Sequence, residues 1–126
     1  MDCLDKHPGL RKIFDQTAYR ESRSLEFLHY LVRVIGPRVV LELGTGRGCS
    51  TAFMALAIGD GRIISIDNYK RGDINSPELV NANLDGCGVL DKVRLINGET
   101  FDAGRLLFSQ ISSELLPIDI CFMDAS

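Results

Sequence analysis

Several features that would mark particular classes of protein are missing from this sequence of 126 residues. No apolar run approaches the ~20 residues that a membrane-spanning helix needs. The N-terminal stretch "MDCLDKHPGLRK" is charged and contains proline, so it lacks the pattern of a signal peptide. We therefore expect a cytoplasmic protein with no membrane partner.

Paired cysteines are also missing. The four cysteines, Cys3, Cys49, Cys87 and Cys121, form no C-x-x-C motif, and Cys3 and His7 are too isolated to indicate a zinc site. We expect four reduced thiols, with Cys121 buried in a strand. A redox role for Cys49 has no support in the sequence.

An excess of basic residues is missing as well. The net charge at pH 7 is −3, with seven basic and five acidic side chains in residues 1–38 and seven basic and twelve acidic in residues 39–126. A nucleic-acid-binding surface needs a clustered basic patch. The charge distribution therefore argues against a nucleic-acid partner and leaves a small-molecule substrate of either sign open.

What the sequence does contain is an alternation of helix-like and strand-like segments. Residues 1–21 indicate a loop and a short amphipathic piece, and residues 22–126 form the expected α/β domain. That domain begins with a helical pattern over residues 24–35. We expect strands at 38–43, 62–67, 92–98 and 118–124, separated by helices at 48–58, 76–86 and 101–115.

This alternation predicts parallel β–α–β units with right-handed crossovers. The fold class is then α/β, an open, doubly wound, Rossmann-like sheet with helices on both faces. Ligands of such sheets bind at the carboxyl ends of the strands. We therefore place the candidate site at the turns that follow Leu43, Asp67, Asn97 and Asp124.

The most informative motif is "VVLELGTGRGCST", residues 39–51. Three glycines stand at every second position from Gly44 to Gly48 and lead into a helix. Glycine allows a ligand to approach the backbone closely, and the free N–H groups of a helix N-terminus favour a carboxylate or phosphate. Ser50 and Thr51 supply hydroxyls that either contact a ligand or cap the helix.

Two well-known nucleotide-binding motifs do not fit this turn. A dinucleotide-binding G-x-G-x-x-G motif would need glycine where Cys49 stands. A phosphate-binding G-x-x-x-x-G-K-[ST] loop would need a lysine that does not follow these glycines. A nicotinamide-dependent oxidoreductase is thus the weakest function we consider, although Asp67 is compatible with it.

Acidic residues stand at the ends of the expected strands. Asp67 ends the second strand, where an acid can accept hydrogen bonds from ribose hydroxyls. Glu99 follows the third strand, Asp124 ends the fourth, and Glu42 lies within the first, where burial is costly unless the carboxylate is paired. Each acid alone could be a helix cap or a solvated loop residue. Together they fit a ligand with an amino-acid end, a ribose and a base, which S-adenosylmethionine combines.

With these residues in place, the sequence resembles the class I S-adenosylmethionine-dependent methyltransferases. Within that class it is most similar to the small-molecule O-methyltransferases of the catechol and caffeoyl-CoA type. The resemblance implies S-adenosylmethionine as the cofactor, strand order 3-2-1-4 and methyl transfer to a small molecule, with a hydroxyl oxygen favoured over nitrogen. It is carried by "VVLELGTGRGCST", "GRIISID", "NANLDGCGVLDKVRLINGET" and "IDICFMDAS".

The resemblance also assigns residues. In metal-dependent members the acid that ends the fourth strand helps to bind a divalent cation such as Mg²⁺, and here this acid is Asp124. No catalytic base can be named, because only Ala125 and Ser126 follow Asp124. The cofactor contacts of the family fall on Glu42, Gly44, Thr45, Gly46, Ser50, Asp67, Asn68, Glu99 and Asp124.

The sequence stops at the fourth strand, whereas the family's sheet continues. In the order 3-2-1-4 the fourth strand would become an exposed apolar edge. We expect either a chain truncated after this strand or an edge completed by a second chain, as in a homodimer. Two functions follow from these expectations: a methyltransferase enzyme, and a non-catalytic module that holds the cofactor or assembles with a partner.

Overall fold

The computed structural model describes residues 2–70, 75–111 and 117–123 of the chain. Helices and strands alternate along it, as the sequence predicts. In chain order the elements are α1 (Cys3–Lys6), α2 (Pro8–Phe14), α3 (Arg23–Ile35), β1 (Val39–Leu43), α4 (Cys49–Ala57), β2 (Arg62–Asp67), α5 (Pro77–Gly86), η1 (Leu90–Lys92), β3 (Val93–Asn97), η2 (Thr100–Asp102), α6 (Ala103–Ile111) and β4 (Ile120–Met123).

The strands form one four-stranded sheet in the order β3-β2-β1-β4. All three pairings are parallel, and Leu41 of β1 pairs with Ile64 of β2 and with Cys121 of β4. The carboxyl ends of the strands therefore lie at one edge of the sheet. This order and direction confirm the predicted doubly wound α/β fold.

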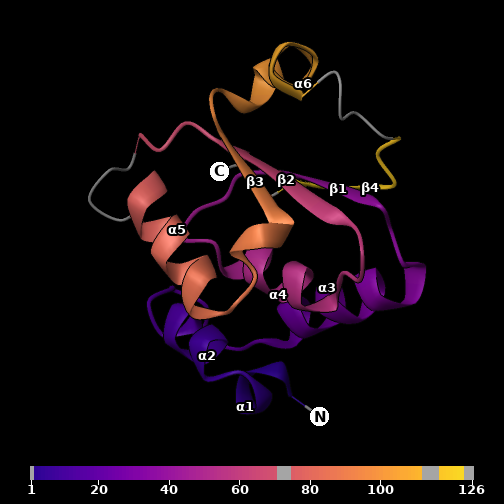
Figure 1. Ribbon diagram of the computed structural model, residues 1–126. Coiled ribbons are helices and arrows are strands. Elements are labelled where there is room, and N and C mark those ends of the chain that lie inside the picture. Colours follow the sequence, from indigo (N-terminus) through magenta and orange to yellow (C-terminus); the bar gives the residue numbers. More distant parts are fainter. Residues whose placement is uncertain (1, 71–74, 112–116, 124–126) are drawn as a thin grey trace.

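Helices cover both faces of the sheet, with α3, α4 and α5 on one face and α6 on the other (Figure 1). The larger hydrophobic core lies under α4, where Phe53 and Met54 are 0% exposed. A smaller core joins α6 to the opposite face of the strands. Neighbouring residues of β1 serve different cores, Val40 the larger and Leu41 the smaller, because successive strand residues point to opposite faces.

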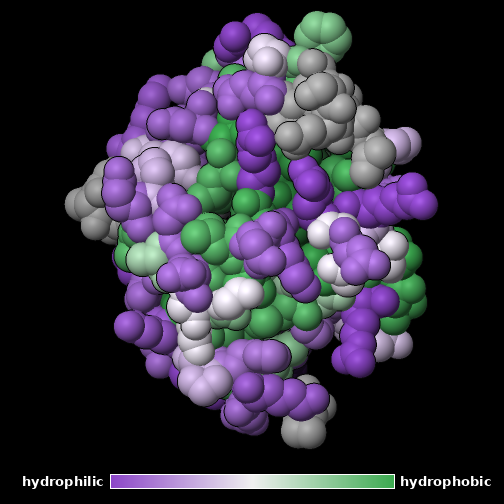
Figure 2. Space-filling view, viewed as in Figure 1, coloured by the Kyte–Doolittle hydropathy of each residue, from purple (hydrophilic) through white to green (hydrophobic). Residues whose placement is uncertain are grey.

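The two edge strands are less covered than the two central ones. All five residues of β1 are buried, whereas β3 and β4 have half-buried or exposed residues over most of their length. In the space-filling view, apolar side chains reach the surface near the centre of the face, among polar ones (Figure 2). The central strands β1 and β2 are therefore the most buried part of the sheet.

Residues 1–21 contain more helix than the sequence indicated. Instead of a loop and one short piece they form α1 and α2, and Leu10 and Ile13 of α2 are buried in the same core as α4. Pro8 starts α2 at a position that tolerates proline, and Leu10 and Ile13 are three residues apart, on one helix face. Such a short helix shows too little periodicity to be recognised from the sequence.

Helix α5 begins as the sequence predicts. Ser76 is its N-cap and accepts a hydrogen bond from the Leu79 N–H, with Pro77 in the first turn. The helix predicted over residues 101–115 is described as η2 and α6, which extends to Ile111, and its remaining residues lie outside the described ranges. Within those ranges no helix is long and apolar enough to cross a membrane.

The prediction of a buried Cys121 is wrong, because this side chain is exposed. Cys121 pairs with Leu41 and so points to the α6 face of the sheet. The core on that face includes residues of β1, β2 and β3 but none of β4 among the described residues. All four cysteines carry free thiols, as predicted.

Candidate functional site

The glycine turn joins β1 to α4 at the carboxyl edge of the sheet. Gly44, Gly46 and Gly48 have φ angles of 100°, 57° and 87°, which residues with a side chain rarely adopt. The Gly44 N–H donates to the Ile66 carbonyl of β2 at 2.8 Å, and the Gly48 N–H donates to the Thr45 carbonyl at 2.9 Å. A Cβ added at Gly46 would meet no atom within 4 Å. The turn is therefore tied to β2 and faces open space at Gly46.

Asp67, at the end of β2, holds this turn through its carboxylate. Oδ2 accepts the N–H groups of Thr45 at 2.9 Å and Gly46 at 3.0 Å, and Oδ1 accepts the Tyr69 N–H at 2.9 Å. A carboxylate offers about four lone-pair positions. Asp67 can therefore support the turn and still accept one further donor at Oδ1.

Glu42 lies beneath the turn and is 0% exposed. Its carboxylate accepts hydrogen bonds from the hydroxyls of Ser50 at 2.5 Å, Ser65 at 2.7 Å and Thr51. These donors provide the compensation that a buried carboxylate requires. The hydroxyls of Ser50 and Thr51 thus point inward, and α4 has Gly48 as its N-cap, with no side-chain cap. A helix N-terminus without a side-chain cap favours an anion.

Asn68 and Glu99 connect the ends of β2 and β3. Asn68 Nδ2 donates to Glu99 Oε2 at 3.0 Å, and Lys70 Nζ lies 2.6 Å from Glu99 Oε1. The bond from Lys70 first, and then the bond from Asn68, lower the pKa of Glu99 from its ordinary value of 4.5. Lys70 is a partner that the sequence analysis did not single out.

The structure brings the predicted residues together in three groups. Gly44, Thr45, Gly46 and Asp67 form the turn and its support; Glu42 and Ser50 lie beneath it; Asn68 and Glu99 form a separate pair. Asp124, predicted to bind the cofactor and a cation, lies outside the described residues. Within the ranges that the structure describes, no group of three or more His, Cys, Asp or Glu side chains could hold a metal ion. The Mg²⁺ site stays a prediction.

Two further residues support the turn and were missed from the sequence. Asn83 of α5 donates from Nδ2 to the Arg47 carbonyl at 2.8 Å. Ser65 pairs with Glu42 in the strand register, which places its hydroxyl next to the carboxylate. A polar residue inside the apolar run "RIISID" was the available signal for Ser65, but its partner depends on the register.

Cys49, in the first turn of α4, lies close to the glycine turn, but its thiol is not in the reactive thiolate form. Burial raises the pKa of its thiol to about 12, and the nearby Cys87 and Glu42 add to the rise. The thiolate is the reactive form of cysteine, and at neutral pH this thiol stays protonated. A redox role for Cys49 therefore finds no support in the structure.

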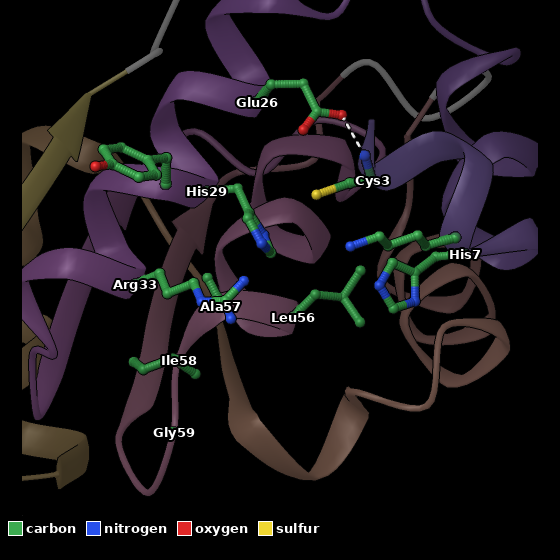
Figure 3. A pocket seen from close by; sticks show the side chains of 11 residues that line it. Cys3, His7, Glu26, His29, Arg33, Leu56, Ala57, Ile58 and Gly59 are labelled. Atoms are coloured by element: carbon green, nitrogen blue, oxygen red, sulfur yellow. Dashed lines mark hydrogen bonds between the residues drawn. The ribbon is translucent and has the colours of Figure 1, made fainter. Parts of the chain in front are cut away.

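A hollow of about 630 Å³ lies at the end of α4 away from the glycine turn and is lined by α1, α3 and the end of α4 (Figure 3). His29 donates from Nδ1 to the Phe53 carbonyl at 2.8 Å, and the Cys3 N–H donates to Glu26 Oε1 at 2.7 Å. Burial, and then a bond of the thiol itself to the Glu26 carboxylate, raise the pKa of the Cys3 thiol to about 12. This thiol is therefore no nucleophile, and the glycine turn remains the candidate site.

Comparison with known proteins gives a consistent result. A family model described as O-methyltransferase matches residues 11–126. A catechol O-methyltransferase from Mycobacterium tuberculosis is 32% identical over 101 residues, which cover 79% of this chain and 41% of that protein. A tRNA (guanine-N(7)-)-methyltransferase from Corynebacterium diphtheriae is 34% identical over 84 residues, which cover 58% of this chain and 31% of that protein.

Among solved structures, the O-methyltransferase TomG from Streptomyces achromogenes, in complex with SAM (S-adenosylmethionine), is similar to this chain. The TM-score is 0.71 and the identity 28%, and the match covers 99% of this chain and 54% of that one. The chain thus spans 41% of the length of the catechol O-methyltransferase and 54% of the length of TomG.

Proposed function

The chain belongs to the O-methyltransferase family, and we propose that it binds S-adenosylmethionine at the glycine turn for methyl transfer to a small-molecule acceptor. The observation that carries this proposal is the support of the turn by Asp67, which binds the N–H groups of Thr45 and Gly46 and keeps one acceptor position open at Oδ1. The bound cofactor would supply the reactive methyl group. The chain's own residues would bind and orient it.

The residues at the turn fit the three parts of the cofactor. The uncapped N-terminus of α4 and the open side of Gly46 suit a carboxylate. The open acceptor position of Asp67 suits a ribose hydroxyl. Asn68 and Glu99 lie at the ends of neighbouring strands and offer polar groups to a base. In this proposal Glu42 and Ser50 act indirectly, from beneath the turn, because their hydrogen bond holds the first turn of α4 against β1.

We propose a hydroxyl oxygen of a small molecule as the methyl acceptor. In support, the catechol O-methyltransferase matches 79% of this chain and the tRNA methyltransferase 58%. The net charge of −3 also offers no excess of basic groups for a nucleic acid. Asp124 would be the ligand of an Mg²⁺ ion, and this assignment belongs to the same proposal.

Calorimetric titration with S-adenosylhomocysteine, with NAD as the control ligand, tests the cofactor. Micromolar binding of S-adenosylhomocysteine alone supports the proposal, and binding of NAD alone would instead support an oxidoreductase. Asp67→Asn is the variant expected to lose binding. Asp60→Asn is its matched control, because Asp60 is an exposed acid in the connection between α4 and β2.

Turnover separates an enzyme from a module that only holds the cofactor. Transfer of a labelled methyl group would be measured on catechols and other hydroxylated acceptors, with and without Mg²⁺, and separately on tRNA. Product from a hydroxylated small molecule supports the proposed acceptor, and product from tRNA alone contradicts it. Cofactor binding without any product favours the non-catalytic module.

We further propose that a second chain pairs with the edge of β4. Within the described sheet β4 is hydrogen-bonded to β1 alone, and Met123 is 68% exposed. Proteins usually cover or pair such an edge. Sedimentation of the purified chain tests this, and a well-folded monomer would contradict it.

A cytoplasmic location completes the proposal, and fractionation of the source cells tests it.

A further inference from the structure

Helix α5 packs one of its faces against the glycine turn. The buried residues of α5 are Val80, Asn83 and Leu84, and their spacing places them on one face of the helix. A Cβ added at Gly48 would lie 3.3 Å from Val80 Cγ1 and 3.6 Å from Leu84 Cδ2. Asn83 Nδ2 donates to the carbonyl of the preceding turn residue, Arg47, at 2.8 Å. The turn is therefore held from α5 as well as from the end of β2.

The bond from Asn83 fixes one peptide plane of the turn. The Arg47 carbonyl and the Gly48 N–H belong to the same planar peptide unit and point in opposite directions. Asn83 donates to this carbonyl at 2.8 Å, and the Gly48 N–H donates to the Thr45 carbonyl at 2.9 Å. Rotation of the unit would break both bonds and would turn the Arg47 oxygen toward the Thr45 oxygen. The peptide unit is therefore anchored at both ends.

The side-chain amide of Asn83 is itself held by Gln16, which follows α2 and lies 67 positions earlier in the chain. Asn83 Nδ2 also donates to Gln16 Oε1 at 3.3 Å, and Gln16 Nε2 donates to Asn83 Oδ1 at 3.4 Å. A primary amide has two donor hydrogens and one acceptor oxygen. If the Asn83 amide turned over, its oxygen would face the Arg47 carbonyl oxygen. The two partners together therefore fix the orientation of this amide.

Helix α2 lies beside α5 in a contact that leaves no room for a side chain at Gly9 (Figure 1). A Cβ added there would lie 2.3 Å from the Gly86 carbonyl oxygen and 3.2 Å from Cys87 Cα. Leu10 of α2 is 0% exposed and lies in the same core as Leu84 of α5. The N-terminal part of the chain thus meets α5 at two points, the backbone contact and the amide pair.

We propose that Asn83 is a positioning residue for the glycine turn, and that α2 and Gln16 brace it from the N-terminal part of the chain. Asn83 keeps the electronegative Arg47 oxygen bonded to α5, so that this oxygen does not turn toward the anionic end of a ligand at the N-terminus of α4. The effect on a bound cofactor rests on the proposed function, whereas the order of the ligand-free turn does not.

NMR of the ligand-free chain tests the positioning role without a ligand. Asn83→Asp keeps the shape of the side chain but replaces the donor group by an oxygen. We expect the carbonyl-carbon signal of Arg47 to shift. The Gly48 amide should exchange with solvent about tenfold faster, because one hydrogen bond corresponds to about that factor. An Arg47 signal that stays in place overturns the proposal.

Asn81→Asp is the matched control on the same helix. Asn81 is exposed, and its Nδ2 donates to the Pro77 carbonyl at 2.8 Å, so this variant makes the same chemical change at a bond that does not involve the turn. Equal Gly48 exchange in the two aspartate variants overturns the positioning role.

Gln16→Leu is the milder variant, because it leaves the short bond from Asn83 to Arg47 in place and removes the longer amide pair. The Gly48 amide should then exchange faster than in the parent chain, but by a smaller factor than in Asn83→Asp. Exchange equal to that of the parent chain contradicts the brace.

Titration with S-adenosylhomocysteine separates this proposal from the proposed function. We expect Asn83→Asp to bind about tenfold more weakly than the parent chain, and Asn81→Asp to bind as the parent does. Asn83→Leu, which removes the donor without adding a charge, should show a similar loss. Parent-like affinity in both Asn83 variants overturns the positioning role for a ligand. A parent chain that does not bind contradicts the proposed function, while faster Gly48 exchange in Asn83→Asp than in Asn81→Asp still supports the order given to the turn.

Discussion

The Oδ2 atom of Asp67 lies 2.9 Å from the backbone nitrogen of Thr45 and accepts its hydrogen bond. The end of β2 is thereby joined to the turn that follows β1. An acid that the sequence assigns to ribose recognition is therefore also a structural support of the glycine turn. Any substitution at Asp67 should then change two properties, the affinity for a ligand and the free energy of unfolding.

Asp67→Asn should lower both the affinity for the ligand and the free energy of unfolding. The amide keeps one acceptor oxygen, and its NH₂ group would face backbone N–H groups that need an acceptor. Hydrogen bonds to a charged group contribute about 1.5–3 kcal/mol, so we expect about that loss of unfolding free energy in urea and at least about tenfold weaker binding of S-adenosylhomocysteine. Asp60→Asn, on the exposed surface, should stay within about 0.5 kcal/mol of the parent. Equal stability of the two variants would show that Asp67 does not support the turn.

Ser65→Ala should weaken the buried polar cluster under the turn. The Ser65 hydroxyl donates to Glu42 and is bonded to Thr45, so its loss leaves a buried carboxylate oxygen and a buried hydroxyl with fewer partners. Such a loss costs about 1–3 kcal/mol, which urea denaturation would measure. Ser109→Ala on the exposed face of α6 is the matched control and should change the unfolding free energy by less than about 0.5 kcal/mol. If both variants unfold at the same urea concentration, the cluster contributes little.

Alanine at two glycines of the turn should have different consequences. Gly48 has a φ of 87°, and an added Cβ would lie 3.3 Å from Val80 Cγ1 of α5. Gly46 has a φ of 57° with open space around the added Cβ. The left-handed conformation alone costs about 1–2 kcal/mol, so both variants should be destabilised, and Gly48→Ala more because of the added contact. Gly46→Ala should instead show the larger loss of affinity for S-adenosylhomocysteine, since its methyl group points to the open side.

Gly86→Ala is the control for this pair. Gly86 is the last residue of α5, and an added Cβ there meets no atom within 4 Å. Alanine favours the helix over glycine by up to about 1 kcal/mol, so thermal unfolding should show an unchanged or slightly raised midpoint. A turn variant that behaves like Gly86→Ala would contradict the strain argument at that glycine.

Much of the fold could be predicted from local patterns in the sequence. The apolar runs around Val40 and Ile64 distinguish strands from amphipathic helices, and Gly44 marks where the first strand ends and the glycine turn begins. The position of Asp67 at a strand end was equally visible. These features depend on neighbouring residues in the sequence, which is why the alternation of elements and the place of the turn agree with the structure. The strand order also agrees, but it was implied by the resemblance to the family and not by local patterns.

The parts that could not be predicted depend on contacts between distant residues. Ser65 matters because the strand register places it beside Glu42, and the sequence does not give the register. Tyr69 adopts a positive φ that its residue type disfavours, and the bond to Asp67 accompanies it. The apolar residues next to Cys121 in the sequence suggest that it lies in the core, yet it lies on an edge strand and is exposed.

Lys70 and Glu99 give the last prediction, which concerns pH. Lys70 Nζ lies 2.6 Å from Glu99 Oε1, and this bond is the first cause of the lowered pKa of Glu99. Because the pKa is lower in the folded chain than the ordinary 4.5, the contribution of Glu99 to stability is present above pH 4.5 and is lost as the pH falls through the folded value. Protonation of Glu99 should therefore weaken its side-chain bonds to Lys70 and Asn68.

Lys70→Met should raise the pKa of Glu99 toward 4.5, and Asn68→Ala should raise it less, because the bond from Asn68 is the second cause. A carbon-detected NMR titration of the Glu99 carboxyl group measures both shifts directly. Lys92→Met is the matched control, since Lys92 Nζ donates to the Ile58 carbonyl and has no bond to Glu99 in the structure as described. If the Glu99 pKa is the same in Lys70→Met and Lys92→Met, the ion pair does not form in solution. Asn68 would then be the one side chain of the pair that bonds Glu99, and acid should weaken cofactor binding no more in the parent than in Lys70→Met.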